Sequence, residues 1–281
     1  MEHDNFQIQR HDQSSNQIQD EVDLLILDDV VAGYVNNVPD QRGVLHHLSL
    51  SVARGETLGL VGESGSGKST LARVVTGLLN IQHGRIIYNG KEIQGLKWKE
   101  RLARTERGIQ MVFQDPFSSF NPKRTVGSQL EEALEIHGTK SARERRRLSH
   151  ETLQNIGLSD SFADRYPHEL SGGQLQRVAL GCALITHPDL LIADEPVSAL
   201  DVSVQAQILE LIKRLQRKYG FTCLFISHDL NVIYYLCDRV AVLVDGQIVE
   251  IGDVEKVYHD PQHDYTKQLV KRVLSLNEMN S

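Results

Sequence analysis

One stretch constrains the fold of this chain more than any other: a glycine-rich loop between an apolar run and the start of a helix. The apolar run ends in residues 58–61 (LGLV), as expected for a strand that is covered on both faces of its sheet. Residues 62–69 (GESGSGKS) then match the pattern G-x-x-x-x-G-K-[ST]. This pattern is typical of a P-loop, which binds phosphate groups between a strand and a helix. The stretch therefore predicts an α/β fold that binds a nucleotide.

The residue types in this loop suit a bound anion. Glycines 62, 65 and 67 can take backbone angles that a β-carbon disfavours, so that successive N–H groups converge on one phosphate. Lys68 can neutralise β- and γ-phosphate charge, and the Ser69 hydroxyl can ligate magnesium. The helix that begins near Ser69 adds its positive N-terminal end. We expect nucleotide contacts from Gly62, Glu63, Ser64, Gly65, Ser66, Gly67, Lys68, Ser69 and Thr70.

Composition limits the kinds of partner. The net charge of −7 over 281 residues argues against free nucleic acid as the main partner. The three cysteines, at 182, 223 and 237, lie among apolar residues without zinc or disulfide spacing, which predicts small buried side chains in a reducing compartment. No apolar run is long enough to cross a bilayer, and no signal peptide is recognised. If the protein works at a membrane, we therefore expect something other than its own chain to hold it there.

The chain divides into three expected regions. Residues 1–22 are rich in Gln, Asn, Asp and His, which predicts a disordered tail, although a family-specific extension fits equally well. Residues 23–270 are expected to form one two-lobed domain, and residues 271–281 a C-terminal tail. Apolar patterning predicts strands at 24–31, 44–52, 57–61, 85–88, 91–93, 108–113, 189–194, 221–227, 240–244 and 247–251.

Strand patterns are absent from the middle of the chain. Residues 126–137 and 141–157 predict two helices instead, the second of them strongly basic. We therefore expect a helical subdomain, over about residues 115–180, inserted into an α/β domain. A further basic stretch, 97–107, predicts a solvent-exposed face, as most runs of charge do.

Two further groups of residues carry chemistry. Asp194 and Glu195 end a hydrophobic strand, where open α/β sheets bind their ligands. Asp194 can hold a magnesium-bound water, and Glu195 can accept a proton from an attacking water. Ser171-Gly172-Gly173 begins a helix and is a second candidate anion site. Either the chain folds the two phosphate sites together, or each serves a nucleotide that a neighbouring subunit binds.

The ordered set of motifs over residues 24 to about 251 resembles the nucleotide-binding subunits of ABC transporters. This resemblance implies a P-loop NTPase (RecA-like) core with an antiparallel β subdomain and an α-helical subdomain insert. The matching segments are the Walker A loop 62–69, the Q-loop residue Gln114, the signature 170–174, the Walker B strand 190–194, Glu195, the D-loop 198–201 and the switch residue His228.

The resemblance also implies roles. It makes Glu195, His228, Lys68 and Gln114 the catalytic residues, with ATP and Mg²⁺ as cofactors. Tyr34 ends the first strand, and its residue type alone favours a core position over a platform for a base. In the family an aromatic at this place stacks on adenine. Magnesium is expected at Ser69, Gln114 and Asp194, and further ATP contacts at Ser171, Gly172, Gly173, Gln174 and Asp201. Because the family's signature completes the ATP site of a second subunit, the resemblance favours a dimer.

Two segments resemble a narrower group. Residues 111–127 (MVFQDPFSSFNPKRTVG) and 260–266 (DPQHDYT) look like importer ATPases for oligopeptides, dipeptides and nickel. Peptide-import relatives often have a longer, cysteine-bearing tail, so the absence of a cysteine after Cys237 favours the nickel or metal-chelate branch. The expected assembly contains a homologous or identical second ATPase subunit, two integral membrane permease subunits and an extracytoplasmic solute-binding protein. The chain would then lie at the cytoplasmic face of the inner membrane, bound peripherally.

Two other functions compete with an importer ATPase that hydrolyses ATP to power uptake. A soluble ABC ATPase of assembly or DNA maintenance often carries a coiled-coil insertion or a second fused cassette, and this sequence has neither. A cassette that binds ATP without turnover is disfavoured, because Lys68, Glu195 and His228 are all present.

The sequence also suggests how ATP is coupled to transport. Residues 114–135 and the following helices are expected to grip a cytoplasmic loop of a permease, with Asn121-Pro122 and Gly127 as a hinge. The alternative is a static cap with a basic face.

Overall fold

The computed structural model describes residues 23–34, 44–105, 108–139 and 141–279. The N-terminal region 1–22 lies outside these residues, and so does the end of the expected C-terminal tail. Helix α9 (Asp264–Met279) runs without a break across the boundary expected at residue 270. In the part of the chain that is described, no helix combines the length and the apolar character that a membrane span needs.

A six-stranded sheet forms the centre of the molecule, in the order β10-β9-β3-β8-β7-β6. Its strands are parallel except for β10, which pairs with β9 as an antiparallel hairpin. Every residue of β3, β7 and β8 is buried, which explains their nearly continuous apolar sequences. The strands are β3 (Thr57–Val61), β6 (Ile109–Val112), β7 (Leu190–Asp194), β8 (Thr222–Ser227), β9 (Arg239–Val244) and β10 (Gln247–Asp253).

A separate antiparallel sheet packs beside the P-loop helix. Its order is β2-β1-β4-β5, and its core side chains pack with those of α1 and with one face of the central sheet in one hydrophobic cluster. This sheet is the antiparallel β subdomain that the family resemblance implied. The strands are β1 (Asp23–Ala32), β2 (Leu45–Ala53), β4 (His83–Tyr88) and β5 (Lys91–Glu92).

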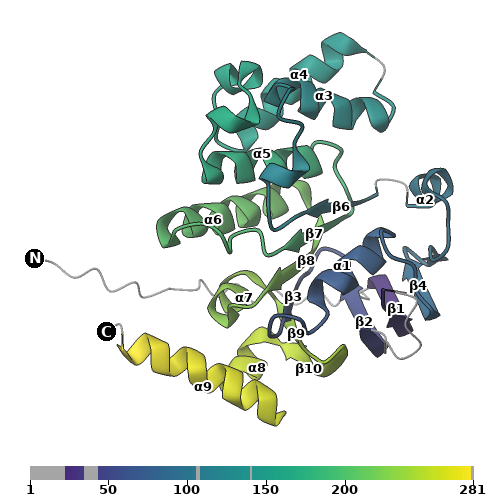
Figure 1. Cartoon of the computed structure of the whole chain (residues 1–281), viewed down its shortest axis with the longest axis vertical. Helices are drawn as coiled ribbons and strands as arrows, with labels where there is room; N and C mark the ends of the chain where they lie inside the picture. Colours follow the sequence, from purple (N-terminus) through teal and green to yellow (C-terminus); the bar gives the residue numbers. More distant parts are fainter. Residues whose placement is uncertain (1–22, 35–43, 106–107, 140, 280–281) are drawn as a thin grey trace, which may run out of the picture.

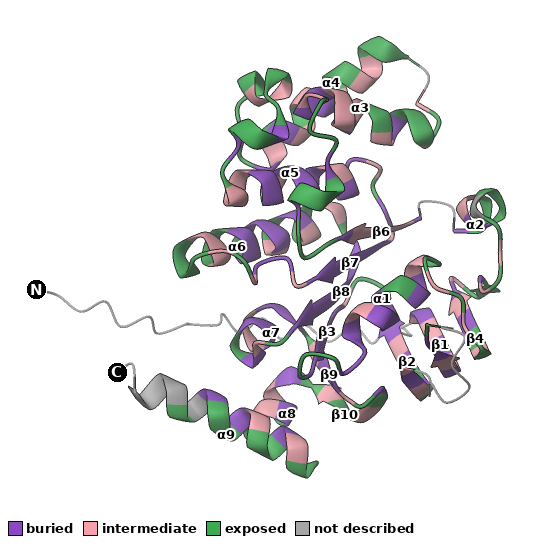
Figure 2. Ribbon diagram, viewed as in Figure 1, coloured by how far each residue is buried: buried purple, intermediate pink, exposed green. Residues whose placement is uncertain are grey.

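The helices divide into a separate lobe and helices that cover the sheets. Figure 1 shows α3, α4 and α5 gathered above the central sheet, while α1 lies between the two sheets and α7 to α9 lie below. Figure 2 shows that the middle strands of the central sheet, β3, β7 and β8, and the inward faces of α5 and α6 are buried. The helices are α1 (Lys68–Thr76), α2 (Trp98–Arg104), α3 (Val126–Ile136), α4 (Ala142–Asn155), α5 (Gly172–Leu184), α6 (Val202–Tyr219), α7 (Leu230–Leu236), α8 (Val254–His259) and α9, with short 3₁₀ helices at Phe117–Ser119, Asp160–Asp164 and Pro167–Glu169.

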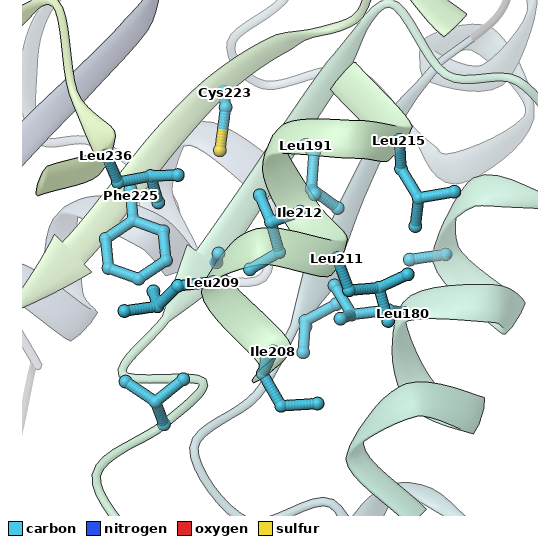
Figure 3. Close-up of a cluster of buried hydrophobic side chains, with 14 of the residues drawn as sticks. Leu180, Leu191, Ile208, Leu209, Leu211, Ile212, Leu215, Cys223, Phe225 and Leu236 are labelled. Atoms are coloured by element: carbon cyan, nitrogen blue, oxygen red, sulfur yellow. The ribbon is translucent and has the colours of Figure 1, made fainter. Parts of the chain in front are cut away.

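Helix α6 joins the helical lobe to the central sheet. Asp201 caps its N-terminus by accepting a hydrogen bond from Val204 N at 3.0 Å, and Gly220 ends it in a left-handed conformation. Its buried residues recur at helical spacing, so one face is apolar. That face packs between the sheet and α5 (Figure 3), and its residues are Ile208, Leu209, Leu211, Ile212 and Leu215. The lobe and the sheet therefore share one hydrophobic core.

Candidate functional site

The P-loop borders an open cavity of about 730 Å³. The cavity lies at the carboxyl ends of parallel strands, where α/β sheets bind ligands. It is large enough for a nucleotide. Its lining residues are Tyr34, Val44, Gly62, Glu63, Ser64, Gly65, Gly67, Lys68, Ser69, Thr70, Gln114, Glu195, His228, Leu269 and Arg272.

The backbone of the P-loop requires glycine at two positions for different reasons. Gly67 has φ 110° and is the residue at which α1 begins, with no side-chain cap on the helix. The N–H groups of the first turn are therefore available to an anion in the cavity. A β-carbon on Gly62 would lie 2.2 Å from the carbonyl oxygen of Leu243, so even alanine would displace the loop from the neighbouring strand.

Lys68 is held beneath the loop that precedes it. Its ammonium group donates hydrogen bonds to the carbonyl oxygens of Gly62 and Glu63, each at 2.8 Å, and the residue is buried. Burial lowers the pKa of Lys68, while the carboxylates of Glu195 and Asp194 act in the opposite direction. A cation in this partly desolvated position attracts phosphate more strongly than one in bulk water does.

Asp194 contacts Ser69, which lines the cavity, although Asp194 itself is not a lining residue. The Ser69 hydroxyl donates to Oδ1 of Asp194 at 3.3 Å, and Asp194 is buried. Burial raises the pKa of Asp194 despite this hydrogen bond. A buried carboxylate beside a hydroxyl offers the hard oxygen donors that Mg²⁺ prefers, so these two residues fit the magnesium ion that the sequence resemblance implies.

Two side chains from different strand ends converge on the carboxylate of Glu195, which follows a third strand. Glu195 Oε2 lies 3.0 Å from Nδ1 of His228 and 3.4 Å from Nε2 of Gln114. Glu195 has φ 47°, an uncommon conformation for this residue type, and its N–H donates to Ile226 O at 3.0 Å. The turn after β7 therefore directs Glu195 into the P-loop cavity, where it can act on a water near the bound phosphates.

The second candidate anion site lies apart from the cavity. Ser171 caps α5, its hydroxyl accepting from Gln174 N at 3.3 Å, while its own N–H donates to Gln174 Oε1 at 3.0 Å. Asp201 caps α6 as described above. Of the expected ATP contacts, Ser171, Gly172, Gly173, Gln174 and Asp201 do not line the cavity, and neither does Ser66, which is buried within the P-loop. One chain therefore does not bring its two phosphate sites together.

The structure places Tyr34 at the cavity and not in the core. The residue is 44% exposed, and its hydroxyl accepts a hydrogen bond from Arg73 of α1. The core position that its residue type favoured is therefore wrong, whereas a position next to a nucleotide base is compatible with this geometry.

Sequence reasoning missed three cavity residues, Val44, Leu269 and Arg272. Val44 lies beside β2, and the other two lie on α9. None belongs to a motif, and no local pattern shows that α9 returns to the P-loop. The signal that was available is the helical spacing of Leu269 and Arg272, which places them on one face of a helix.

Comparisons with known proteins agree with this geometry. Residues 45–198 match a family model described as ABC transporter. The chain is 46% identical over 227 residues to the oligopeptide transport ATP-binding protein OppF of Bacillus subtilis (strain 168), covering 80% of this chain and 74% of OppF. It is also 46% identical over 223 residues to AmiF, an oligopeptide transport ATP-binding protein of Streptococcus pneumoniae serotype 4, covering 79% of this chain and 72% of AmiF.

Two solved structures of ATP-binding cassette and ABC transporter proteins are also similar to this chain. A dimeric structure of the ATP-binding cassette MJ0796, in a post-hydrolysis state with ADP and Pi, superposes with a TM-score of 0.73 at 31% identity, covering 82% of this chain and 98% of that one. The cbiO1 protein of Clostridium perfringens, part of the transporter complex cbiONQ, gives a TM-score of 0.74 at 26% identity, covering 92% and 98%. The fold, the motifs and the relatives together show that this chain belongs to the ABC transporter family, as an ATP-binding subunit.

Proposed function

We propose that this ATPase subunit powers the uptake of peptides through partner permeases, with Glu195 activating the attacking water. The observation that carries the chemistry is the position of Glu195, which lines the P-loop cavity and lies within hydrogen-bond distance of His228. In Glu195→Gln the side chain keeps its size and loses its basicity. This variant should bind ATP and lose most of its turnover. Full turnover in Glu195→Gln would overturn the assignment.

The chain's own residues divide the work of phosphoryl transfer between them. The loop N–H groups and Lys68 hold the phosphates, and His228 orients the Glu195 carboxylate. Magnesium would be held by Ser69, Asp194 and Gln114, and would supply positive charge to the phosphate oxygens. Because Gln114 Nε2 faces Glu195, its amide oxygen is the atom left to face a metal.

The signature segment is proposed to act on the nucleotide of a second subunit. The support is positional, because Ser171 begins a helix whose N-terminus lies outside the cavity of its own chain. The similar cassette MJ0796 has a dimeric structure. In such a dimer Ser171, Gly172, Gly173 and Gln174 would face the partner's phosphates, and Asp201 would lie at the same interface.

Peptides are the cargo that the relatives favour. OppF and AmiF are named as oligopeptide transport proteins, and a Brucella ovis relative that is 46% identical over 232 residues is named as a putative peptide import protein. The expectation of nickel or a metal chelate rested on the end of the chain and draws no support from these names. Binding of peptides and of nickel chelates to the extracytoplasmic solute-binding protein of the same system distinguishes the two. Preference for nickel would overturn the peptide proposal.

The assembly that we propose places the chain at the cytoplasmic face of the membrane, held by two permease subunits. A shallow cavity of about 280 Å³ lies between the central sheet and the helical lobe, and Phe113, Phe120 and Ile136 are among its lining residues. Phe113, Ile136 and the nearby Phe117 are exposed apolar side chains. An exposed apolar group beside a groove is typical of a protein–protein contact, and a cytoplasmic loop of a permease would fit here.

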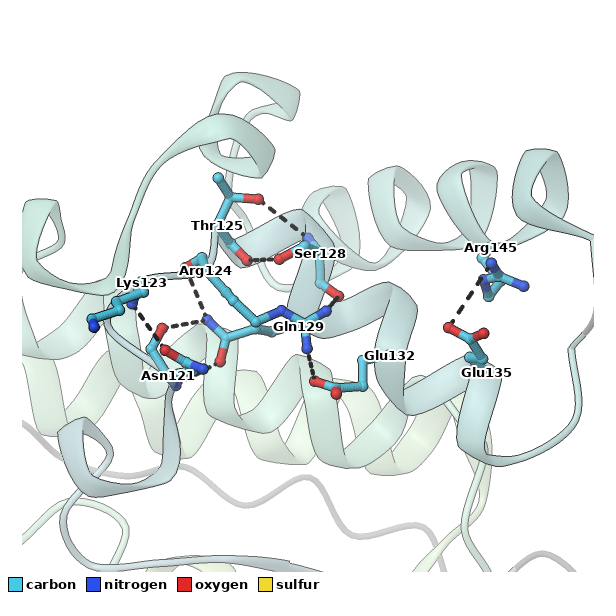
Figure 4. Close-up of polar contacts among 9 residues, drawn as sticks. All are labelled: Asn121, Lys123, Arg124, Thr125, Ser128, Gln129, Glu132, Glu135 and Arg145. Carbon is cyan, nitrogen blue, oxygen red and sulfur yellow. Dashed lines mark hydrogen bonds and ion pairs between the residues drawn. The ribbon is translucent and has the colours of Figure 1, made fainter.

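The contacts after the Q-loop change the expected position of the hinge. The Gln129 side chain accepts from Asn121 N at 2.8 Å and donates to the carbonyls of Asn121 and Arg124, at 3.3 and 3.1 Å (Figure 4). Arg124 also pairs with Glu132 at 2.6 Å. Residues 121–129 are therefore tied to α3 and should move with the lobe. A hinge would lie closer to Gln114 than the predicted Asn121-Pro122 and Gly127.

Coupling is tested by measuring ATPase activity and uptake separately. Phe117→Ala and Ile136→Ala remove exposed apolar groups at or near the shallow cavity beside the helical lobe, and both residues lie outside the P-loop cavity. Loss of uptake with basal ATPase preserved would support permease docking. Unchanged uptake in a variant with both Phe117→Ala and Ile136→Ala would show that this surface belongs to a static cap and not to a docking site. Co-purification with membrane subunits separates a transporter from a soluble ABC ATPase.

A further inference from the structure

The C-terminal helix α9 contributes to the wall of the nucleotide cavity. Leu269 and Arg272 line the cavity together with the P-loop, although they lie about two hundred positions further along the chain. They are three residues apart on α9 and therefore lie on one face of it. Figure 1 shows α9 along the lower edge of the molecule, near α7 and α8.

The position of α9 does not depend on Arg272. Thr266 is fully buried, and Val270 and Val273 pack in the main hydrophobic cluster. The carboxylate of Glu250 accepts hydrogen bonds from the backbone N–H groups of Gln262 and His263, at 2.8 and 2.9 Å, just before the helix begins. The fold therefore holds the helix, and with it residue 272, beside the P-loop.

Arg272 points at the P-loop itself. Its Nη1 lies 3.0 Å from Oε1 of Glu63, a residue inside the phosphate-binding loop. Both side chains are largely exposed, 64% and 59%, so this ion pair contributes little to folding stability. The pair instead holds the guanidinium group of Arg272 at the cavity wall. The remaining N–H donors of the guanidinium stay available to another acceptor, because arginine carries five of them.

The side chains that line the cavity carry too little positive charge on Lys68 alone to balance a nucleoside polyphosphate. Among the described lining residues, Lys68 and Arg272 are the two that carry a full positive charge, and Glu63 and Glu195 are carboxylates. Lys68 already donates to two loop carbonyls. A nucleoside polyphosphate carries several negative charges, and guanidinium groups bind phosphate oxygens in a bidentate manner.

We propose that Arg272 is a further nucleotide-binding residue, which α9 supplies to the phosphate chain of a nucleoside triphosphate and which Glu63 positions. This inference rests on ATP binding at the P-loop, as proposed above. It makes the C-terminal helix part of the ATP site within one chain, in addition to the motifs that lie between residues 62 and 228.

The test compares Arg272→Ala with Lys271→Ala in the full-length chain. Lys271 is the neighbouring exposed cation on α9 and does not line the cavity, so it controls for net charge and for the helix. The dissociation constant is measured for a non-hydrolysable ATP analogue, ADP and AMP by titration calorimetry. Arg272→Ala should weaken binding of the ATP analogue by about five-fold and that of AMP much less, because the charge contacts phosphates. Arg272→Lys should recover part of the loss.

Ionic strength and thermal stability separate the proposed role from a structural one. The difference in affinity for the ATP analogue between the original chain and Arg272→Ala should shrink as the salt concentration rises from about 0.05 to about 0.5 M, because exposed charges are screened. The melting temperature should be unchanged. Equal affinities in Arg272→Ala and the original chain, or equal losses for AMP and the ATP analogue, would overturn the role of Arg272. A chain that binds no ATP at all would instead overturn the proposed function.

Discussion

The Nδ1 atom of His228 lies 3.0 Å from Oε2 of Glu195, although the two residues are 33 positions apart. They meet because β7 and β8 are neighbouring parallel strands, so that the residues following each strand emerge at one edge of the sheet. His228 is 58% exposed at its side chain, whereas Glu195 is 17% exposed. The imidazole thus covers the carboxylate from the solvent side.

His228→Ala should slow ATP hydrolysis by at least about tenfold, because it removes the group that orients Glu195. Binding of a non-hydrolysable ATP analogue should change far less, since Lys68 and the loop amides remain. Steady-state phosphate release and equilibrium binding measure the two effects. Equal losses in binding and turnover would show that His228 acts on nucleotide affinity instead.

Ser171→Arg should abolish turnover without weakening ATP binding to the isolated chain, because Ser171 lies outside the chain's own cavity. A complementation experiment gives the sharper result. Chains carrying Ser171→Arg are mixed with chains carrying Glu195→Gln, each inactive alone. If the signature acts on the partner's nucleotide, a mixed dimer contains one intact site, and phosphate release should return.

A mixture that stays inactive would favour action within one chain. If the partner ATPase is a homologous chain and not a second copy, one substitution is placed on each of the two chains. The inactive control then carries both substitutions on the same chain. That chain's own site lacks Glu195 and the partner's site lacks Ser171, so neither composite site is intact.

Cys223 and Cys237, which are buried, should resist thiol reagents in the folded chain. Burial raises the pKa of Cys223 to about 12, and it raises that of Cys237 well above the ordinary value. Because the thiolate is the reactive species, labelling by an aromatic disulfide reagent at pH 8 should be slow. In denaturant all three cysteines of the chain should react. Rapid labelling of Cys223 without denaturant would show that the central sheet opens locally.

Ile212→Ala should lower the free energy of unfolding by about 3 kcal/mol, because it leaves a cavity between α6 and the sheet. Ile212 is 1% exposed. Val202→Ala on the same helix is the control: Val202 is 82% exposed, and its loss should cost less than about 0.5 kcal/mol. Urea titration followed by circular dichroism measures both. Similar midpoints for the two variants would contradict the packing described for α6.

Much of the fold follows from local patterns. The apolar runs and turn residues predict most strands to within about two residues, because strands buried on both faces have continuous apolar sequences. The helical insert is predicted in the same way. The P-loop and Glu195 carry their chemistry in their spacing, and the cavity is lined by most of the loop and by Glu195 as expected. Asp194 does not line the cavity but accepts a hydrogen bond from Ser69, which does.

Long-range packing is what the sequence does not reveal. Arg101 lies in the basic stretch 97–107, which predicted an exposed face, yet it is buried and donates to the carbonyl oxygens of Ile93 and Val75. Nothing local distinguishes it from the exposed Arg104. The same limit hides Arg272, since its place at the cavity depends on the path of the chain from β10 through α8 to α9.

The cap on α5 has a consequence for the chemistry of the signature. The Ser171 oxygen already accepts a hydrogen bond from the backbone N–H of Gln174 in its own helix, and the hydroxyl still has its own proton to donate to another group. A serine used in this way is a donor to its surroundings and suits an anion better than a metal ion. Threonine would keep both the acceptor and the donor, whereas alanine would lose the helix cap and the hydroxyl donor in a single change.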